Sequence, residues 1–218
     1  RYNKAKNIDG RVFKGKAIAQ FVQFNFRNPV QHAEVAWNEI INEPDHSLVE
    51  DNINIYNSRG TGASPILIHN NYIQGAYPLP ATNKEYSGGG ILTDAPAKDS
   101  TGTTAHVRIF DNQLVGLGNY CIGIAGGNHI EVFSNRAVVS GMVDDERAFT
   151  CWTSGIWAKD FYETGSTYKN SFFDNKLAVV GQGGEWRNEI MEEIEAAAAV
   201  NNNSVLKWNK KTQEFLQL

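Results

Sequence analysis

The sequence predicts an all-β solenoid of about five rungs, each built from three short strands. Three observations lead to this prediction. A motif of the form apolar-x-apolar-x-x-Asn-x-apolar recurs along the chain, the intervals between its asparagines vary from 23 to 41 residues, and another apolar strand precedes most copies of the motif. A fixed motif at a variable period is typical of rungs of one coil that are joined by loops of unequal length.

The motif is clearest in the segment 105–114, where Val107, Ile109 and Leu114 are the apolar positions and Asn112 is the asparagine. The asparagines of all five copies are Asn38, Asn71, Asn112, Asn135 and Asn175. Stacked asparagine amides hydrogen-bond to one another and also satisfy the backbone of a tight bend, so we expect these side chains to form one column. Replacing Asn112 should then cost on the order of 1–3 kcal/mol, because buried polar groups would lose their partners.

A first strand with alternating apolar residues precedes the motif in each rung. These strands are expected at 21–26, 53–56, 91–94, 122–125 and 156–159. Stacking the equivalent strands of successive rungs gives three parallel sheets around a narrow core. We call the sheet made by these strands the first sheet.

The two ends of the chain depart from the repeat, which we assign to residues 17–180. Residues 1–16 are polar and basic, and they resemble the tail of a rung whose front is missing. Residues 181–218 are expected to form a C-terminal cap, with a short helix over 188–200 that begins at Asn188 and places Ile190, Met191 and Ile194 on its apolar side. No helix that could cover the other end is visible in 1–16. An uncovered rung edge can pair with another chain, so we expect an end-to-end contact or a contact with a preceding domain.

Composition excludes several classes of protein. The net charge of −4 offers no basic field for a nucleic-acid partner, and no run of 18 apolar residues predicts insertion into a membrane. The chain begins at Arg1 without Met, as a processed protein would. Cys121 and Cys151 are compatible with one disulfide in an oxidising compartment or with two buried thiols.

The Asn-ended rungs, the Gly-Ile first strands at 90–91 and 155–156, and the loops rich in Gly and Pro resemble the right-handed parallel β-helix proteins of the pectate-lyase-like superfold. The resemblance covers about residues 17–180. It implies an extracellular or cell-surface protein that handles polysaccharide in a groove on the first sheet. The superfold carries lyases, hydrolases, epimerases, tailspikes and adhesins, so the resemblance predicts fold rather than activity. The chain lacks an Asp-Pro-His epimerase signature, the paired aspartates of polygalacturonases and an arginine in the first-sheet strands.

The outward face of the first sheet carries the candidate binding residues. Sugar rings stack on aromatic faces, and their hydroxyls hydrogen-bond to amides and carboxylates, so this mixture suits carbohydrate. We expect Trp157, Asn54, Gln23 and Asn25 to bind the polysaccharide. Long loops at 74–89 and 140–154 flank a short one at 115–120, which predicts a depression beside this sheet. The alternative is that these are the ordinary polar residues of a solvated sheet.

Two reactions are compatible with this face. A lyase needs a base for the proton alpha to a uronate carboxyl group, and Lys159 or Tyr56 could supply it while Arg59 neutralises the carboxylate. A hydrolase needs two facing carboxylates. Only Asp94 lies clearly on the face, which makes hydrolysis the weaker version. Its candidate loop partners are Asp51, Asp144, Asp145 and Glu146.

No cofactor and no metal is predicted. The five histidines lack the helical spacing of a zinc site. The run Asp144-Asp145-Glu146 is the one candidate for Ca²⁺, although adjacent acids rarely converge on one ion and a solvated loop is favoured.

Two hypotheses from different classes follow. The first is an extracellular polysaccharide-binding or polysaccharide-active protein, with a lyase considered before a hydrolase. The second is a non-catalytic structural or adhesive module, or a self-assembling surface subunit. A cleft that holds a base and a cationic partner favours the enzyme, whereas a flat sheet with these residues apart favours the scaffold.

Overall fold

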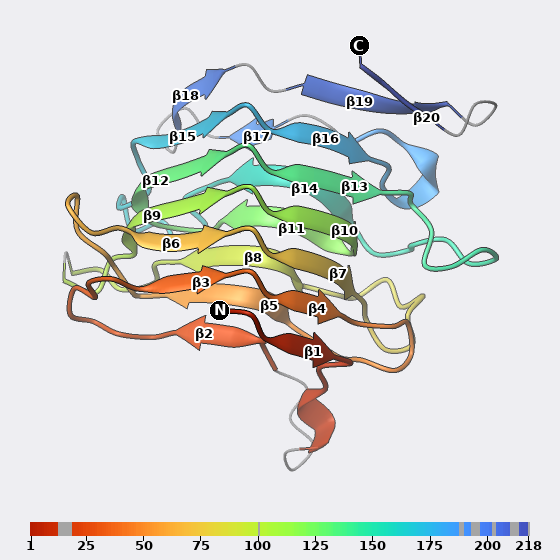
Figure 1. Ribbon diagram of the computed structural model, residues 1–218, viewed down its shortest axis with the longest axis horizontal. Helices are drawn as coiled ribbons and strands as arrows, with labels where there is room; N and C mark the ends of the chain where they lie inside the picture. Colours follow the sequence, from red (N-terminus) through yellow and green to blue (C-terminus); the bar gives the residue numbers. More distant parts are fainter. Residues whose placement is uncertain are drawn as a thin grey trace.

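The computed structural model describes residues 1–12, 19–99, 101–187, 190–192, 197–201, 204–209 and 214–217. These residues form a parallel β-solenoid whose rungs stack on one another in chain order (Figure 1). Each rung contributes one strand to each of three sheets, and all pairings between rungs are parallel. The predicted three-sheet solenoid is therefore confirmed.

From β1 to β19, strands that follow one another along the chain belong to different sheets, so each sheet collects every third strand. The last strand, β20, instead pairs antiparallel with β19. The first sheet contains β2 (Val22–Phe24), β5 (Asp51–Tyr56), β8 (Gly89–Asp94), β11 (Asn119–Ile124), β14 (Thr153–Ala158) and β17 (Ile190–Glu192). The second contains β3 (Glu34–Ala36), β6 (Ile66–His69), β9 (Ala105–Phe110), β12 (Asn128–Phe133), β15 (Asn170–Phe173) and β18 (Ala197–Asn201). The third contains β1 (Lys4–Lys6), β4 (Glu39–Ile41), β7 (Tyr72–Ala76), β10 (Gln113–Leu117), β13 (Arg136–Val139), β16 (Lys176–Val179), β19 (Ser204–Asn209) and β20 (Glu214–Gln217). Two short 3-10 helices are η1 (Gly10–Val12) and η2 (Gln182–Gly184).

The predicted helix over 188–200 is wrong in the part of that segment that the structure describes. Residues 190–192 form β17, which pairs with β14, and residues 197–201 form β18, which pairs with β15. The free edges of β14 and β15 present unpaired backbone groups, and pairing with them overrides the helix propensity of the Ala- and Glu-rich segment. The first and second sheets therefore have six strands each, one more than the five rungs expected. The proposed N-cap Asn188 lies outside the described residues.

Columns of branched apolar residues fill the core. In the first sheet, Ile53, Ile91, Ile122 and Ile156 lie in register on neighbouring strands and are fully buried. Each such side chain contributes about 1.5–3 kcal/mol through burial. Because these residues point inward, their sequence neighbours Asn54, Leu92, Gly123 and Trp157 form a row on the outer face.

The asparagine column is confirmed. The side-chain amide of Asn71 donates to Oδ1 of Asn112 at 2.9 Å, Asn112 donates to Asn135 at 3.0 Å, and Asn135 donates to Asn175 at 3.0 Å. Asn38 donates to Asn71 in the same way at 2.8 Å. Each acceptor oxygen also binds the backbone N–H of the preceding asparagine in the column, as Asn112 does for Asn71. Asn3, which was not predicted, extends the column by donating to Asn38 at 3.0 Å.

Residues 4–6 of the N-terminal segment form β1, which pairs with β4 at the edge of the third sheet. Cys121 and Cys151 are both buried and both free, so they form no disulfide here. Among the described residues, none of the helices has the length and apolar character needed to span a bilayer.

Candidate functional site

A pocket of about 800 Å³ lies on the outer face of the first sheet, where the sequence predicts a depression. Six of the eight predicted site residues line it: Gln23, Asn54, Tyr56, Asp94, Trp157 and Lys159. Asn25 and Arg59 are not among the lining residues. Arg59 forms a backbone bridge with Ala105 at the start of β9. The pKa of His106 on that strand is lowered by burial, then by the charges of His129 and Arg59. Arg59 does not line the pocket that contains the candidate bases Lys159 and Tyr56.

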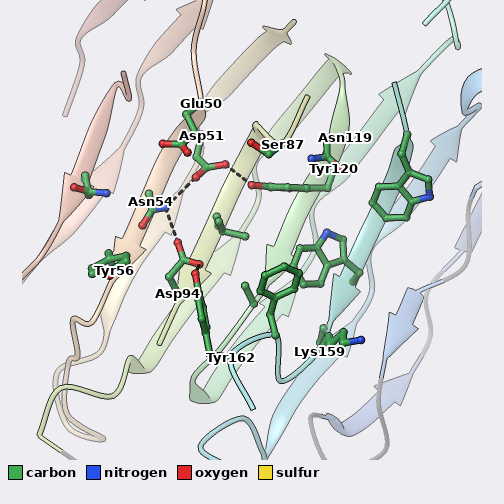
Figure 2. A pocket seen from close by; sticks show the side chains of 17 residues that line it. Glu50, Asp51, Asn54, Tyr56, Ser87, Asp94, Asn119, Tyr120, Lys159 and Tyr162 are labelled. Carbon is green, nitrogen blue, oxygen red and sulfur yellow. Dashed lines mark hydrogen bonds between the residues drawn. The ribbon is translucent and has the colours of Figure 1, made fainter. Parts of the chain in front are cut away.

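One wall of the pocket is built from carboxyl groups joined by an amide (Figure 2). Nδ2 of Asn54 donates to Oδ2 of Asp51 at 2.9 Å and to Oδ2 of Asp94 at 2.8 Å. Both carboxyls are nearly enclosed, since Asp51 is 2% exposed and Asp94 is 5% exposed. Glu50 lies beside Asp51 and also lines the pocket. We call Glu50, Asp51, Asn54 and Asp94 the acidic wall.

A tyrosine completes the hydrogen bonds of each aspartate. Tyr120, on β11, donates its hydroxyl to Oδ1 of Asp51, two strands away. It reaches that far because its ring lies over Gly89 of the intervening strand, where an added Cβ would be 2.5 Å from the ring. Tyr162, in the loop after β14, donates to Oδ1 of Asp94 at 2.7 Å.

Burial changes the proton affinity of the acidic wall. It raises the pKa of Asp51 to about 7, although the hydrogen bonds from Tyr120 and Asn54 act in the opposite direction. Burial likewise raises the pKa of Asp94, against the hydrogen bonds from Tyr162 and Asn54. The pKa of Glu50 is raised by burial and then by the charge of Asp94. Carboxyls that hold protons near neutral pH are the groups that enzymes use as general acids.

Aromatic rings form the floor and the opposite wall. The indole of Trp157 lies over Gly123 of the neighbouring strand, where an added Cβ would be 2.7 Å from Cζ2 of the ring. Tyr120 meets Trp157 edge to face, with ring centroids 5.6 Å apart. Phe161, also in the loop after β14, is 63% exposed at the pocket. Trp157 and Phe161 thus present apolar ring surface to the pocket, whereas Tyr120 is almost fully buried, with 3% of the residue exposed.

The loop that carries Phe161 and Tyr162 is tied down by one carboxylate. Asp160 accepts hydrogen bonds from the backbone N–H of Gly165 at 2.7 Å and from the hydroxyl of Thr167 at 3.1 Å. The hydroxyl of Thr164 donates to it at 3.3 Å. Asp160 thus fixes the curvature of the loop, which positions Tyr162 against Asp94.

Two polar atoms of the pocket-lining residues lack a protein partner. Oδ1 of Asn54 and Nε1 of Trp157 are the only buried side-chain nitrogen or oxygen atoms in the described part of the chain without a hydrogen bond. One is an acceptor and the other is a donor. Buried polar atoms are almost always hydrogen-bonded, so these two indicate where a polar ligand or water binds.

One acid of the suggested Ca²⁺ site, Asp144, is engaged by an arginine. Asp144 pairs with Arg147 at 2.6 Å, and Arg147 also pairs with Asp45 at 2.6 Å. Over the residues that the structure covers, no group of three or more His, Cys, Asp or Glu side chains is arranged to hold a metal ion.

Several lining residues were not among the predicted site residues. Asp51 was considered only as a loop partner of Asp94, and the others were not considered at all: Glu50, Ser87, Asn119, Tyr120, Trp152, Phe161 and Tyr162. Gly89 and Gly123 are the sequence features that could have indicated the positions of the aromatic rings. A glycine on the outer face of a strand leaves room for a ring from the next strand.

Comparisons with known proteins add no information about this pocket. Comparison of the chain with protein-family models, with curated proteins and with solved structures finds no match.

Proposed function

We propose that the protein binds a saccharide in the pocket on the first sheet and hydrolyses its glycosidic bond with Asp51 and Asp94. Binding is supported by the aromatic side chains of Trp157 and Phe161 beside a wall of hydrogen-bonding groups. The resemblance to the pectate-lyase-like superfold and the extracellular location that it implies are part of the same proposal.

The observation that carries the proposal is the pairing of two carboxyls through one amide. Oδ2 of Asp51 and Oδ2 of Asp94 both lie within 2.9 Å of the same nitrogen of Asn54, so they are less than about 6 Å apart. A separation of about 5–5.5 Å is typical of glycosidases that retain the anomeric configuration. Hydrolysis therefore becomes the better-supported enzymatic version, and it predicts retention.

The roles of the two carboxyls follow from their surroundings. Asp51 is the more deeply buried and has its pKa raised to about 7, so it is suited to protonate the oxygen of the leaving sugar. Asp94 is suited to attack the anomeric carbon as a carboxylate, which forms a covalent glycosyl ester as the glycosidic bond breaks. Asp51, now ionised, then takes a proton from water, and the attack of that water on the anomeric carbon releases Asp94.

The lyase version has less support. Lys159 is the one cation among the lining residues, and it lies on the far side of the pocket from Asp51 (Figure 2). Arg59, the expected partner of a uronate carboxylate, does not line the pocket.

A non-catalytic binding module is the second candidate. It is favoured by the near-complete burial of Asp51 and Asp94, whose four carboxyl oxygens all accept hydrogen bonds from neighbouring side chains. In that case the same pocket would bind a saccharide without cleaving it.

A panel of oligosaccharides separates these functions. Binding is measured by calorimetry, hydrolysis by the release of reducing ends, and elimination by the absorbance of unsaturated products. We expect Trp157→Ala to weaken binding at least about tenfold. Asp51→Asn removes the general acid and should lower turnover by about a hundredfold or more. Asp94→Asn removes the nucleophile and should lower turnover at least as much. Asn25→Ala, which alters an exposed residue outside the lining, is the matched control. Binding without turnover would favour the module, unsaturated products would favour the lyase, and no binding to any saccharide would refute the proposal.

A further inference from the structure

The acidic side chains of the pocket lie on one side of it. Glu50, Asp51 and Asp94 lie along β5 and β8, whereas Lys159 lies across the pocket beyond the aromatic rings (Figure 2). The shifts in pKa of the three acids arise from burial, from neutral hydrogen-bond donors and from one another. Within the part of the chain that the structure describes, no cation contributes to the pKa shifts of the acidic wall.

Neutral donors supply the hydrogen bonds of this wall. Asp51 accepts from Tyr120 and Asn54, and Asp94 accepts from Tyr162 and Asn54. Glu50 accepts from the side-chain amide of Gln20 at 2.9 Å. Neutral donors stabilise a carboxylate less than a cation does. Each oxygen of the two aspartates thus has a hydrogen-bond donor, but in the described residues these donors are all neutral.

Asn54 adds an independent observation. Its side chain is buried, with 4% of the residue exposed, and its amide nitrogen is shared between Asp51 and Asp94. The amide cannot rotate to offer that nitrogen elsewhere without breaking both bonds, so Oδ1 stays an unpaired acceptor in the acidic wall. The acidic wall has more hydrogen-bond acceptors than donors. A ligand group with several N–H donors would complement it.

We infer that the saccharide bound in this pocket carries a free, protonated amine that is held by the acidic wall, so that the substrate class is an amino sugar rather than a uronate or a neutral sugar. The inference rests on the proposed function, since it names the substrate of the same site. An ammonium group supplies three donors and one positive charge, whereas a hydroxyl supplies one donor and no charge. A uronate carboxylate would add a further negative charge to the wall.

The binding of a cation also has a consequence for protons. A nearby positive charge favours the ionised form of a carboxyl, so it lowers the pKa of each acid that it contacts. Burial raises the pKa of Asp51 to about 7, so at a pH where the sugar amine is already protonated and Asp51 is still largely protonated, binding of the ammonium should release protons from Asp51.

The test compares three probes of equal length: β-1,4-linked oligomers of glucosamine, of N-acetylglucosamine and of glucose. Calorimetry at a pH below the pKa of the sugar amine should show the glucosamine oligomer binding at least about tenfold more tightly than the other two. Its affinity should fall with added salt, and heats measured at this same pH in two buffers of different ionisation enthalpy should report proton release.

Variants locate the effect. Glu50→Gln lies outside the hydrogen-bonded chain of Asp51, Asn54 and Asp94, so it should fold and yet reduce the preference for glucosamine several-fold. Asp94→Asn should reduce it further. Asp145→Asn removes an equal charge at an exposed position outside the pocket lining and should leave the preference unchanged.

Each outcome bears on a different claim. Equal affinity for the three oligomers would overturn the inference about the amine and leave saccharide binding intact. A preference for glucosamine that Asp145→Asn reduces as much as Glu50→Gln does would show attraction by overall charge and would also overturn the inference. If the protein bound none of these three oligomers and no other saccharide of the panel, the proposed function would be refuted as well.

Discussion

The asparagine column allows a quantitative test of what holds the rungs together. In Asn112→Ala, four hydrogen bonds disappear. Oδ1 accepts from the backbone N–H and the amide of Asn71, and Nδ2 donates to the carbonyl of Ile68 and to Oδ1 of Asn135. At about 1 kcal/mol each, the free energy of unfolding should fall by about 4 kcal/mol. This exceeds the 1–3 kcal/mol expected from the sequence, because the residue serves both the column and the backbone.

Urea denaturation followed by far-UV circular dichroism measures this loss. Asn25→Ala, at an exposed position, should change the free energy of unfolding by less than about 0.5 kcal/mol. Asn112→Ala and Asn135→Ala share a hydrogen bond, so their losses should not add when the two changes are combined. A loss below about 1 kcal/mol for Asn112→Ala would refute the reasoning, because the buried amides would then contribute no more than water does.

Three further predictions concern the pocket. Burial raises the pKa of Asp51 from 3.8 to about 7, so ionisation of Asp51 destabilises the fold as the pH rises through this range. Asp51→Asn should therefore gain stability relative to the wild type between about pH 4 and pH 7, as measured by urea denaturation at several pH values. Gly123→Ala would place a Cβ 2.7 Å from the Trp157 ring and should cost about 1–3 kcal/mol, with a shift in tryptophan fluorescence. Tyr162→Phe removes a hydrogen bond that lowers the pKa of Asp94, so the carboxyl ¹³C signal should titrate at higher pH.

Each of these has a control or a contrary result. A stability difference between Asp51→Asn and the wild type that stays constant with pH would contradict the assigned pKa. Gly62→Ala, where an added Cβ would meet nothing within 4 Å, should leave the fluorescence unchanged. An unaltered titration midpoint in Tyr162→Phe would show that this hydroxyl does not stabilise the Asp94 carboxylate.

The fold was predictable because its main determinants are local and repeated. The asparagine of each rung, with the apolar residues around it, specifies the same corner every time, and the column formed as expected from Asn38 to Asn175. The last rung was missed because its strands form by pairing with the edges of β14 and β15, a tertiary effect that local propensity does not contain.

The site was only partly predictable, for a related reason. Strict alternation in β5 places Asp51 on the same side as the inward-facing Ile53. The structure instead turns Asn52 inward, where its amide donates to the carbonyls of Gly75 and Gly89, and this leaves Asp51 facing the pocket. Tyr120 reaches Asp51 from two strands away, a relation set by the register of the rungs. Sequence pattern can assign a residue to a face, but it does not show which neighbours meet there.

Parallel stacking places the strands of the first sheet at a regular spacing along the solenoid axis. Neighbouring strands lie about 4.8 Å apart, a step close to the length of one pyranose unit. Five consecutive strands, β2, β5, β8, β11 and β14, supply side chains to the pocket. A glycan aligned with the solenoid axis would advance by one sugar for each strand that it crosses. Affinity should then rise in discrete steps with oligomer length and level off once the glycan extends past the last contributing strand.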